Sequence, residues 1–148
     1  VGPGHEFLRH IVRTRLLLMR QRTRLANAIR GHMAEYGIVA PIGREGRQRL
    51  IEMIVDASDE RVPPLARGCL RLLVIQLQLV NAQALETDRQ IKASARSTEV
   101  GRRLMEIPGV GPVLASAIVA SVADPGAFHR GRNLAAWIGL VPRQNSSG

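Results

Sequence analysis

Apolar residues recur at alternating spacings of four and three between positions 66 and 91, and this feature most constrains the fold. The series is Ala66, Leu70, Leu73, Leu77, Val80, Ala84, Thr87 and Ile91. Because this spacing keeps every member on one face of an α-helix, it predicts a long helix that packs against another one in a coiled coil or a helical hairpin. An ordinary three-helix bundle without dimerisation is the alternative.

Residues 7–36 are expected to form the partner helix, either in the same chain or in a second copy. The segment has no proline and a single glycine, and Ile11, Leu18 and Leu25 recur at seven-residue spacing. After a turn punctuated by Pro41 and Gly43, a shorter helix is predicted over 47–55, followed by an acidic, proline-containing loop.

Composition supports an all-α fold. Hydrophobic residues make up 45% of the chain, yet it contains only two Phe, one Trp and one Tyr. Aliphatic side chains must therefore fill the core, which favours helices over a β-sandwich. Cys69 is the single cysteine, so an intrachain disulfide and a thiolate-rich zinc site are excluded. The longest apolar runs fall short of the ~20 residues of a membrane-spanning helix, so no membrane span is expected.

The segment after Thr98 has a different pattern, which predicts a small helical domain. A short helix is followed by Pro-Gly-Val-Gly-Pro over 108–112 and by a helix of small residues over 113–123. This pattern is typical of the helix-hairpin-helix motif, in which Gly109 and Gly111 let the backbone approach a phosphate. No Lys or Arg lies between Leu104 and His129. A purely structural hairpin is therefore the alternative.

Charge points to a polyanionic partner. The chain carries a net charge of +9, and residues 1–50 hold ten arginines against three acids. Nucleic acid is the first candidate, because neutralising phosphates releases condensed counterions, and an acidic membrane surface is the second. Basic faces that are merely solvated are the third interpretation. The candidate nucleic-acid contacts are Arg13, Arg20, Arg22, Arg24, Arg30, Arg102, Arg103, Gly109, Gly111, Arg130, Arg132 and Arg143.

Two serines near the end of the sequence are the candidate nucleophiles. Ser146 and Ser147 follow Arg143, and Arg130 and Arg132 lie upstream. A hydroxyl beside guanidinium groups suits phosphoryl transfer, because arginine stabilises the charge that develops on phosphate oxygens. Taken alone, however, a Ser-Ser-Gly segment is typical of a flexible loop. The four histidines are scattered without metal-ligand spacing, so no metal site is predicted within this sequence.

Two segments together resemble one protein family. The first contains Arg20-Gln21-Arg22-Thr23-Arg24-Leu25, Glu35-Tyr36-Gly37 and Pro41, and the second contains Ile107-Pro108-Gly109-Val110-Gly111-Pro112, Gly131-Arg132, Ala135-Ala136-Trp137-Ile138-Gly139-Leu140-Val141-Pro142-Arg143-Gln144 and Ser146-Ser147-Gly148. In this order they resemble the central helical region and the transposase domain of the insertion-sequence one-hundred-and-ten family.

The resemblance implies a bacterial DNA transposase or recombinase that works with DNA, and with element-encoded RNA, in the cytoplasm at the nucleoid. It implies Ser147 as the nucleophile that forms a transient phosphoserine link to DNA. It also implies an N-terminal RuvC-like domain whose Asp, Glu, Asp and Asp side chains bind Mg²⁺. That domain and the family's basic continuation have no counterpart here, so we expect the chain alone to be inactive and to contain no cofactor.

The expected organisation has three parts. Residues 1–7 look like a cut or vector-derived end, residues 8–97 form a helical coiled-coil region through which copies associate, and residues 98–148 begin the transposase domain. The fold class is thus all-α, with a long helical hairpin or coiled-coil arm followed by a small helical domain with a helix-hairpin-helix-like motif. A non-catalytic helix-hairpin-helix DNA-binding module is the alternative function.

Overall fold

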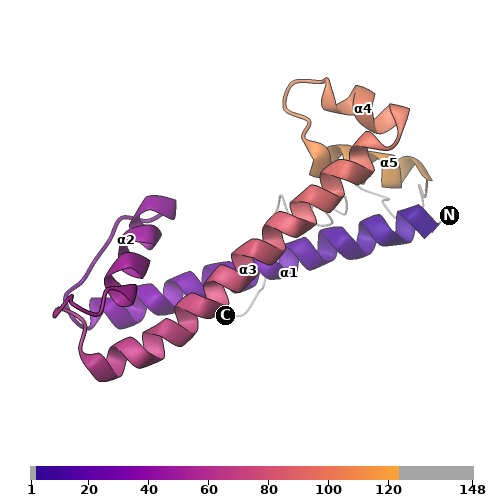
Figure 1. The fold of residues 1–148 in the computed structure, drawn as a ribbon. Coiled ribbons are helices and arrows are strands. Elements are labelled where there is room, and N and C mark those ends of the chain that lie inside the picture. The colour runs from indigo at the N-terminus through magenta and orange to yellow at the C-terminus, as the bar shows by residue number, and fades with distance from the viewer. Residues whose placement is uncertain (1–2, 124–148) are drawn as a thin grey trace, which may run out of the picture. The chain divides into compact units, whose positions relative to one another are not determined.

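The computed structural model of the protein describes residues 3–123 and confirms the all-α prediction (Figure 1). Within this range the chain forms helices joined by short loops, and it contains no strand. The elements are α1 (Pro3–Ala34), α2 (Arg44–Val55), α3 (Pro64–Arg96), α4 (Glu99–Met105) and α5 (Pro112–Ala123).

Two helices begin earlier than the sequence pattern indicated. Helix α1 begins at Pro3 rather than at Phe7. Proline suits the first turn of a helix, because its fixed φ is helical and its missing N–H would have no partner there. Helix α2 begins at Arg44 rather than at Arg47, directly after Gly43, whose φ of 110° ends the preceding turn. Polar residues in the first turn of a helix carry no apolar periodicity, so the pattern did not detect them.

The chain divides into two compact units. Residues Leu18–Gln83 form one unit, called here the α2 unit, and the described residues before and after it form the other, called the α4–α5 unit. Helices α1 and α3 each contribute to both units.

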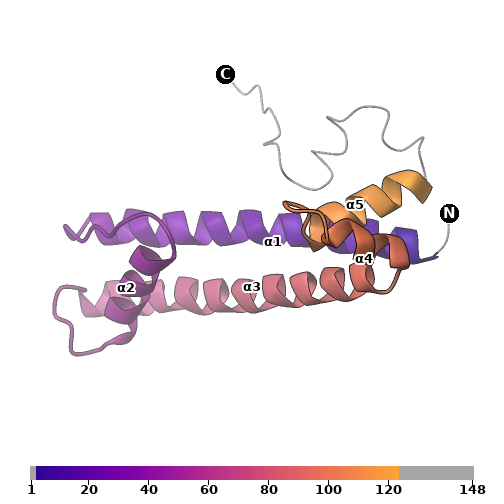
Figure 2. The same cartoon turned by 90° about the horizontal axis from the view of Figure 1, so that it is seen from above.

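The α2 unit is organised around one aliphatic core. Figure 2 shows α2 lying against the parts of α1 and α3 that belong to this unit. Its buried residues come from all three helices and from the loop before α3: Ile29, Met33, Leu50, Ile51, Ile54, Val62, Leu70, Val74 and Leu77. Helix α1 therefore packs against α3 of the same chain, which answers the question that the seven-residue spacing left open.

A buried arginine holds the loop between α2 and α3. Arg67 is only 7% exposed, and its guanidinium donates hydrogen bonds to the carbonyl oxygens of Met53 (2.8 Å), Ile54 (2.7 Å) and Val62 (3.3 Å), and also to that of Asp59. The first two carbonyls belong to the last turn of α2, where the helix dipole favours a cation. This one side chain therefore ties the end of α2 to the start of α3.

In the α4–α5 unit, small side chains allow close packing. Ala84, Ile91 and Ala95 of α3 are buried, as are Ala115, Ala117 and Ala120 of α5. Arg15 of α1 forms a 2.5 Å ion pair with Asp88 of α3. Gly101 of α4 lies so close to the end of α3 that an added Cβ would come within 2.0 Å of the Ala95 carbonyl oxygen.

Helix α3 carries two apolar stripes on different faces. The first is the predicted series, of which Leu70, Leu77, Val80, Ala84, Thr87 and Ile91 are buried. The second was not predicted and is exposed: Leu65 (91%), Leu72 (69%), Ile75 (62%) and Leu79 (51%). Within residues 3–123, α3 is the one helix that is long and apolar enough to cross a membrane by length and composition, and 28% of its most apolar window is buried. A two-striped helix reaches this composition without crossing one.

Candidate nucleic-acid interface

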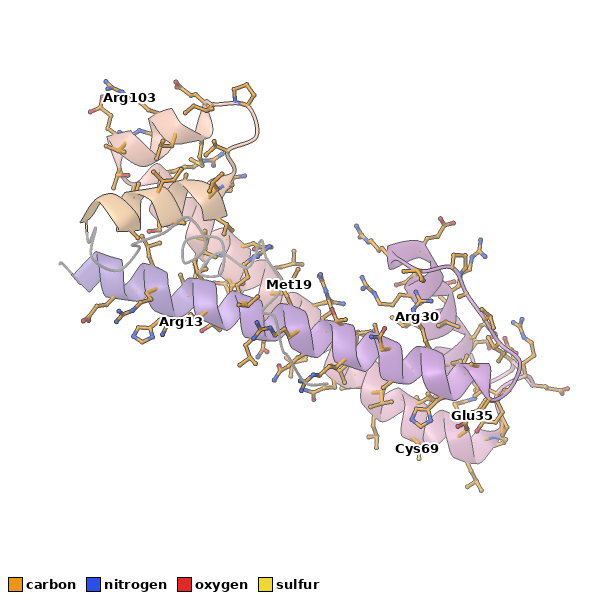
Figure 3. The ribbon with its side chains drawn as sticks, turned by 180° about the vertical axis from the view of Figure 1, so that it is seen from behind. Arg13, Met19, Arg30, Glu35, Cys69 and Arg103 are labelled. Atoms are coloured by element: carbon orange, nitrogen blue, oxygen red, sulfur yellow. The ribbon has the colours of Figure 1, made fainter. Side chains whose placement is uncertain are left out.

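Three predicted contacts lie on one exposed face of α1. Arg13, Arg20 and Arg24 are separated by seven and four residues, so their side chains project on the same side of the helix, and all three are exposed. Figure 3 shows the side chain of Arg13 at the surface of α1. None of the three forms an ion pair with another residue of the range 3–123. These guanidinium groups are therefore open to an anionic partner.

Arg22 lies on a different face of α1. Because it is two residues from both Arg20 and Arg24, it projects from nearly the opposite side of the helix, and it is half-buried. The sequence block that looked like one basic segment is therefore divided by the helix into two basic faces.

Arg30 stabilises a loop. Its guanidinium donates hydrogen bonds to the carbonyl oxygens of Ala40 (2.9 Å), Pro41 (2.9 Å) and Gly43 (3.2 Å), which precede α2. Figure 3 shows Arg30 pointing from α1 toward α2. The same loop presses on α2, because a Cβ at Gly46 would lie 1.7 Å from the Pro41 carbonyl oxygen. Most of the donor capacity of Arg30 is therefore used within the protein.

Arg47 lies near Arg22 and Arg44, and sequence reasoning singled out neither Arg44 nor Arg47 as a candidate contact. Burial lowers the pKa of the Arg47 guanidinium, and the cations Arg22, Arg30 and Arg44 lower it further. Both residues were counted in the basic block of residues 1–50. Only the packing of α2 on α1, however, shows that Arg47 lies near Arg22.

The predicted hairpin is a helix, a tight turn and a second helix. Thr98 caps α4 by accepting a hydrogen bond from the Gly101 N–H (3.0 Å), and α5 begins at Pro112. Gly109 has a φ of 86°, a conformation that favours glycine, and Gly111 is exposed directly before α5. Of the two glycines predicted to shape the turn, only Gly109 therefore has a conformation that requires glycine.

The arginines near this hairpin bond within the protein. Arg103 forms a 2.7 Å ion pair with Glu99, and Arg102 donates a 2.7 Å hydrogen bond to the Arg96 carbonyl oxygen at the end of α3. Both side chains remain exposed. Neither contact directs the guanidinium toward the glycine turn, so any anion at the turn depends chiefly on backbone N–H groups.

Two carboxylates are strongly stabilised in their charged form. Hydrogen bonds from the Arg61 side chain and backbone lower the pKa of Asp59 to about 2. Hydrogen bonds from Arg89 and Gln90 lower the pKa of Glu86 to about 2. Each acid therefore serves a local ion pair. Among residues 3–123, no group of three or more His, Cys, Asp or Glu side chains is placed to hold a metal ion.

The remaining predicted residues lie outside the described range. They are Arg130, Arg132, Arg143 and the candidate nucleophiles Ser146 and Ser147.

Comparison with known proteins identifies close relatives of this sequence. Residues 101–148 match the family described as Transposase IS116/IS110/IS902. A "Probable family 20 transposase" of Pseudomonas aeruginosa is 40% identical over 140 residues, which are 94% of this chain and 41% of that protein. The "Transposase for insertion sequence element IS1111A" of Coxiella burnetii is 36% identical over 93% of this chain and 38% of its own length.

A third relative, the "Transposase for insertion sequence element IS1328" of Yersinia enterocolitica, is 30% identical over 92% of this chain and 40% of its own length. The chain thus spans less than half of the curated relatives that it matches. No solved structure is significantly similar to it. Residues 101–148 therefore belong to the IS116/IS110/IS902 transposase family, and the residues before them align with transposases of insertion sequences.

Proposed function

We propose that this chain is the helical arm and the start of the serine-bearing domain of a DNA transposase, and that it binds nucleic acid. The observation that carries the proposal is the family match of residues 101–148, together with alignment of nearly the whole chain to named transposases. The exposed, unpaired arginines of α1 supply the charge that a phosphodiester backbone requires.

The proposed chemistry is phosphoryl transfer to serine. The Ser147 oxygen attacks a DNA phosphorus, the bond to one deoxyribose oxygen breaks, and that oxygen leaves with a proton as a free hydroxyl. Attack by the hydroxyl of another strand then reforms a phosphodiester and releases the serine, so strands are exchanged without hydrolysis. Arg130, Arg132 and Arg143 would stabilise the charge on the phosphate oxygens. Magnesium would be bound by the RuvC-like domain that the family resemblance implies.

Nucleic-acid binding is tested by reversing the charge of the outer face of α1. The triple change Arg13→Glu, Arg20→Glu and Arg24→Glu is expected to weaken binding of duplex DNA by more than about tenfold near 0.1 M salt. The slope of log K against log salt should fall by about 0.9 for each lost phosphate contact. Fluorescence anisotropy over a salt series measures both quantities.

All three side chains are exposed and unpaired, so the variant should keep its helix content, which circular dichroism checks. Unchanged affinity in a folded variant would remove this face of α1 from the interface.

We also propose that copies of the protein associate through the exposed stripe of α3. Leu65, Leu72 and Leu79 lie at seven-residue spacing, and Ile75 lies between the last two, as in the seam of a coiled coil. A second copy would cover this surface and so remove it from water.

The double change Leu72→Lys and Leu79→Lys is accordingly expected to convert a dimer into a monomer in sedimentation or light-scattering measurements. The control places lysines at Val39 (85% exposed) and Val55 (52% exposed), which lie off the stripe and should leave the dimer intact. A wild-type chain that is monomeric at about 100 μM would contradict the proposal.

A non-catalytic helix-hairpin-helix module is the second candidate function, and the α4–α5 geometry favours it. The positive φ of Gly109 and the start of α5 at Pro112 fit a hairpin that would hold a phosphate through backbone N–H groups, because the turn itself supplies no cation. The two candidates differ in covalent chemistry. A binding module never forms a protein–DNA adduct that survives denaturation, whereas a serine recombinase does.

A further inference from the structure

Four arginines converge where α2 packs on α1 in the α2 unit. Arg22 and Arg30 come from α1, and Arg44 and Arg47 come from α2. Arg22, Arg30 and Arg44 are each close enough to Arg47 to lower the pKa of the Arg47 guanidinium. Gathering like charges on a partly buried surface costs free energy, which an attracted anion would offset.

Among residues 3–123, no carboxylate forms an ion pair with Arg22, Arg44 or Arg47. Glu45 is adjacent to Arg44 in sequence, but its carboxylate lies 3.7 Å from Arg49 instead. Arg22, Arg44 and Arg47 form neither an ion pair nor a side-chain hydrogen bond with another residue of the range 3–123. Their donors are therefore free, in contrast to those of Arg30.

Arg30 fixes the geometry of the cluster. By binding the carbonyl oxygens of Ala40, Pro41 and Gly43, it holds the loop that leads directly into Arg44. The close approach of Gly46 to Pro41 keeps the first turn of α2 against the same loop. The positions of Arg44 and Arg47 relative to α1 are thus set before any ligand binds.

We propose that Arg22, Arg44 and Arg47 form a binding site for a nucleic-acid phosphodiester backbone, separate from the exposed face of Arg13, Arg20 and Arg24. The inference rests on the proposed function and deepens it, because it gives the arm a second contact with the nucleic acid. Guanidinium forks match phosphate oxygens in pairs, and three of them on two helices can contact successive phosphates. The site contacts the backbone and not base edges, so it binds without sequence preference.

The test compares two triple variants of the 148-residue chain that remove the same formal charge. The cluster variant carries Arg22→Gln, Arg44→Gln and Arg47→Gln. The control variant carries Arg49→Gln, Arg61→Gln and Arg89→Gln, whose arginines already pair with Glu45, Asp59 and Glu86. Anisotropy with single-stranded RNA, hairpin RNA and duplex DNA over a salt series measures the affinities. Polyglutamate serves as a competitor.

The cluster variant is expected to lose roughly 10- to 100-fold in affinity near 0.1 M salt, and its salt slope should fall by about two to three. The control should lose less than about threefold. The nucleic acid for which the cluster variant loses the most affinity is the ligand of the site. Because the substitutions remove the repulsion among these positively charged side chains, the cluster variant should unfold at the same temperature as the wild type or at a higher one.

Four outcomes would overturn the site. Equal losses of affinity in the two variants would show that only the total charge of the chain matters. Binding by the wild-type chain would in that case still support the proposed function. A lower unfolding temperature in the cluster variant would make these arginines structural. Competition by polyglutamate as strong as that by nucleic acid would exclude phosphodiester recognition. Absence of any wild-type binding would contradict the site and nucleic-acid binding by this chain together.

Discussion

Arg67→Met is expected to destabilise the protein by about 3–5 kcal/mol, because it removes a buried cation and leaves several carbonyl oxygens without a donor. Methionine fills a similar volume, so the effect reports the lost hydrogen bonds more than a cavity. The carbonyls of Met53, Ile54, Asp59 and Val62 all bind this guanidinium. Chemical denaturation measures the loss, and hydrogen exchange should locate it between residues 53 and 67.

Arg71→Met is the matched control, one helical turn further along α3. Arg71 is exposed, and its guanidinium forms one hydrogen bond of 3.2 Å, to the Val55 carbonyl oxygen. Its replacement should cost less than about 1 kcal/mol. Equal destabilisation by the two changes would show that burial of Arg67 contributes nothing. Arg67→Lys should give an intermediate loss, because an ammonium cannot match the planar fork that reaches four carbonyls.

The helices were predictable because their signals are local. The three-and-four spacing of α3 marks its buried face, and glycine and proline separate α1, α2 and α3 in the sequence. The exposed stripe of Leu65, Leu72 and Leu79 has equally regular spacing. Periodicity identifies apolar faces but does not say which of two such faces a neighbour covers, so only the structure distinguishes them.

The roles of the arginines were not predictable from position in the sequence. Arg30 and Arg67 bind backbone carbonyls, Arg15 pairs with Asp88, and Arg22 and Arg47 form no ion pair with another residue of the range 3–123. All five are the same residue type within helices, and their surroundings come from loops and helices distant in the chain. Charge counting therefore located the basic half of the protein correctly but could not separate structural arginines from those available to a ligand.

The candidate nucleophile depends on a different kind of inference. Ser146 and Ser147 were selected by resemblance to a family, which the match of residues 101–148 now supports at the level of the family. Composition alone favoured a flexible loop at this position. The choice between the two hydroxyls therefore needs an experiment that detects the covalent bond between serine and DNA.

In a full-length transposase that carries this sequence, Ser147→Ala is expected to reduce strand exchange by at least about a thousandfold while leaving DNA binding unchanged. Without the hydroxyl no phosphoserine bond can form, so the covalent protein–DNA adduct seen on denaturing gels should disappear as well. Ser146→Ala is the control and should retain both exchange and adduct. An adduct that persists in Ser147→Ala but vanishes in Ser146→Ala would move the nucleophile to the neighbouring serine. Persistence in the double variant would exclude serine chemistry at this segment.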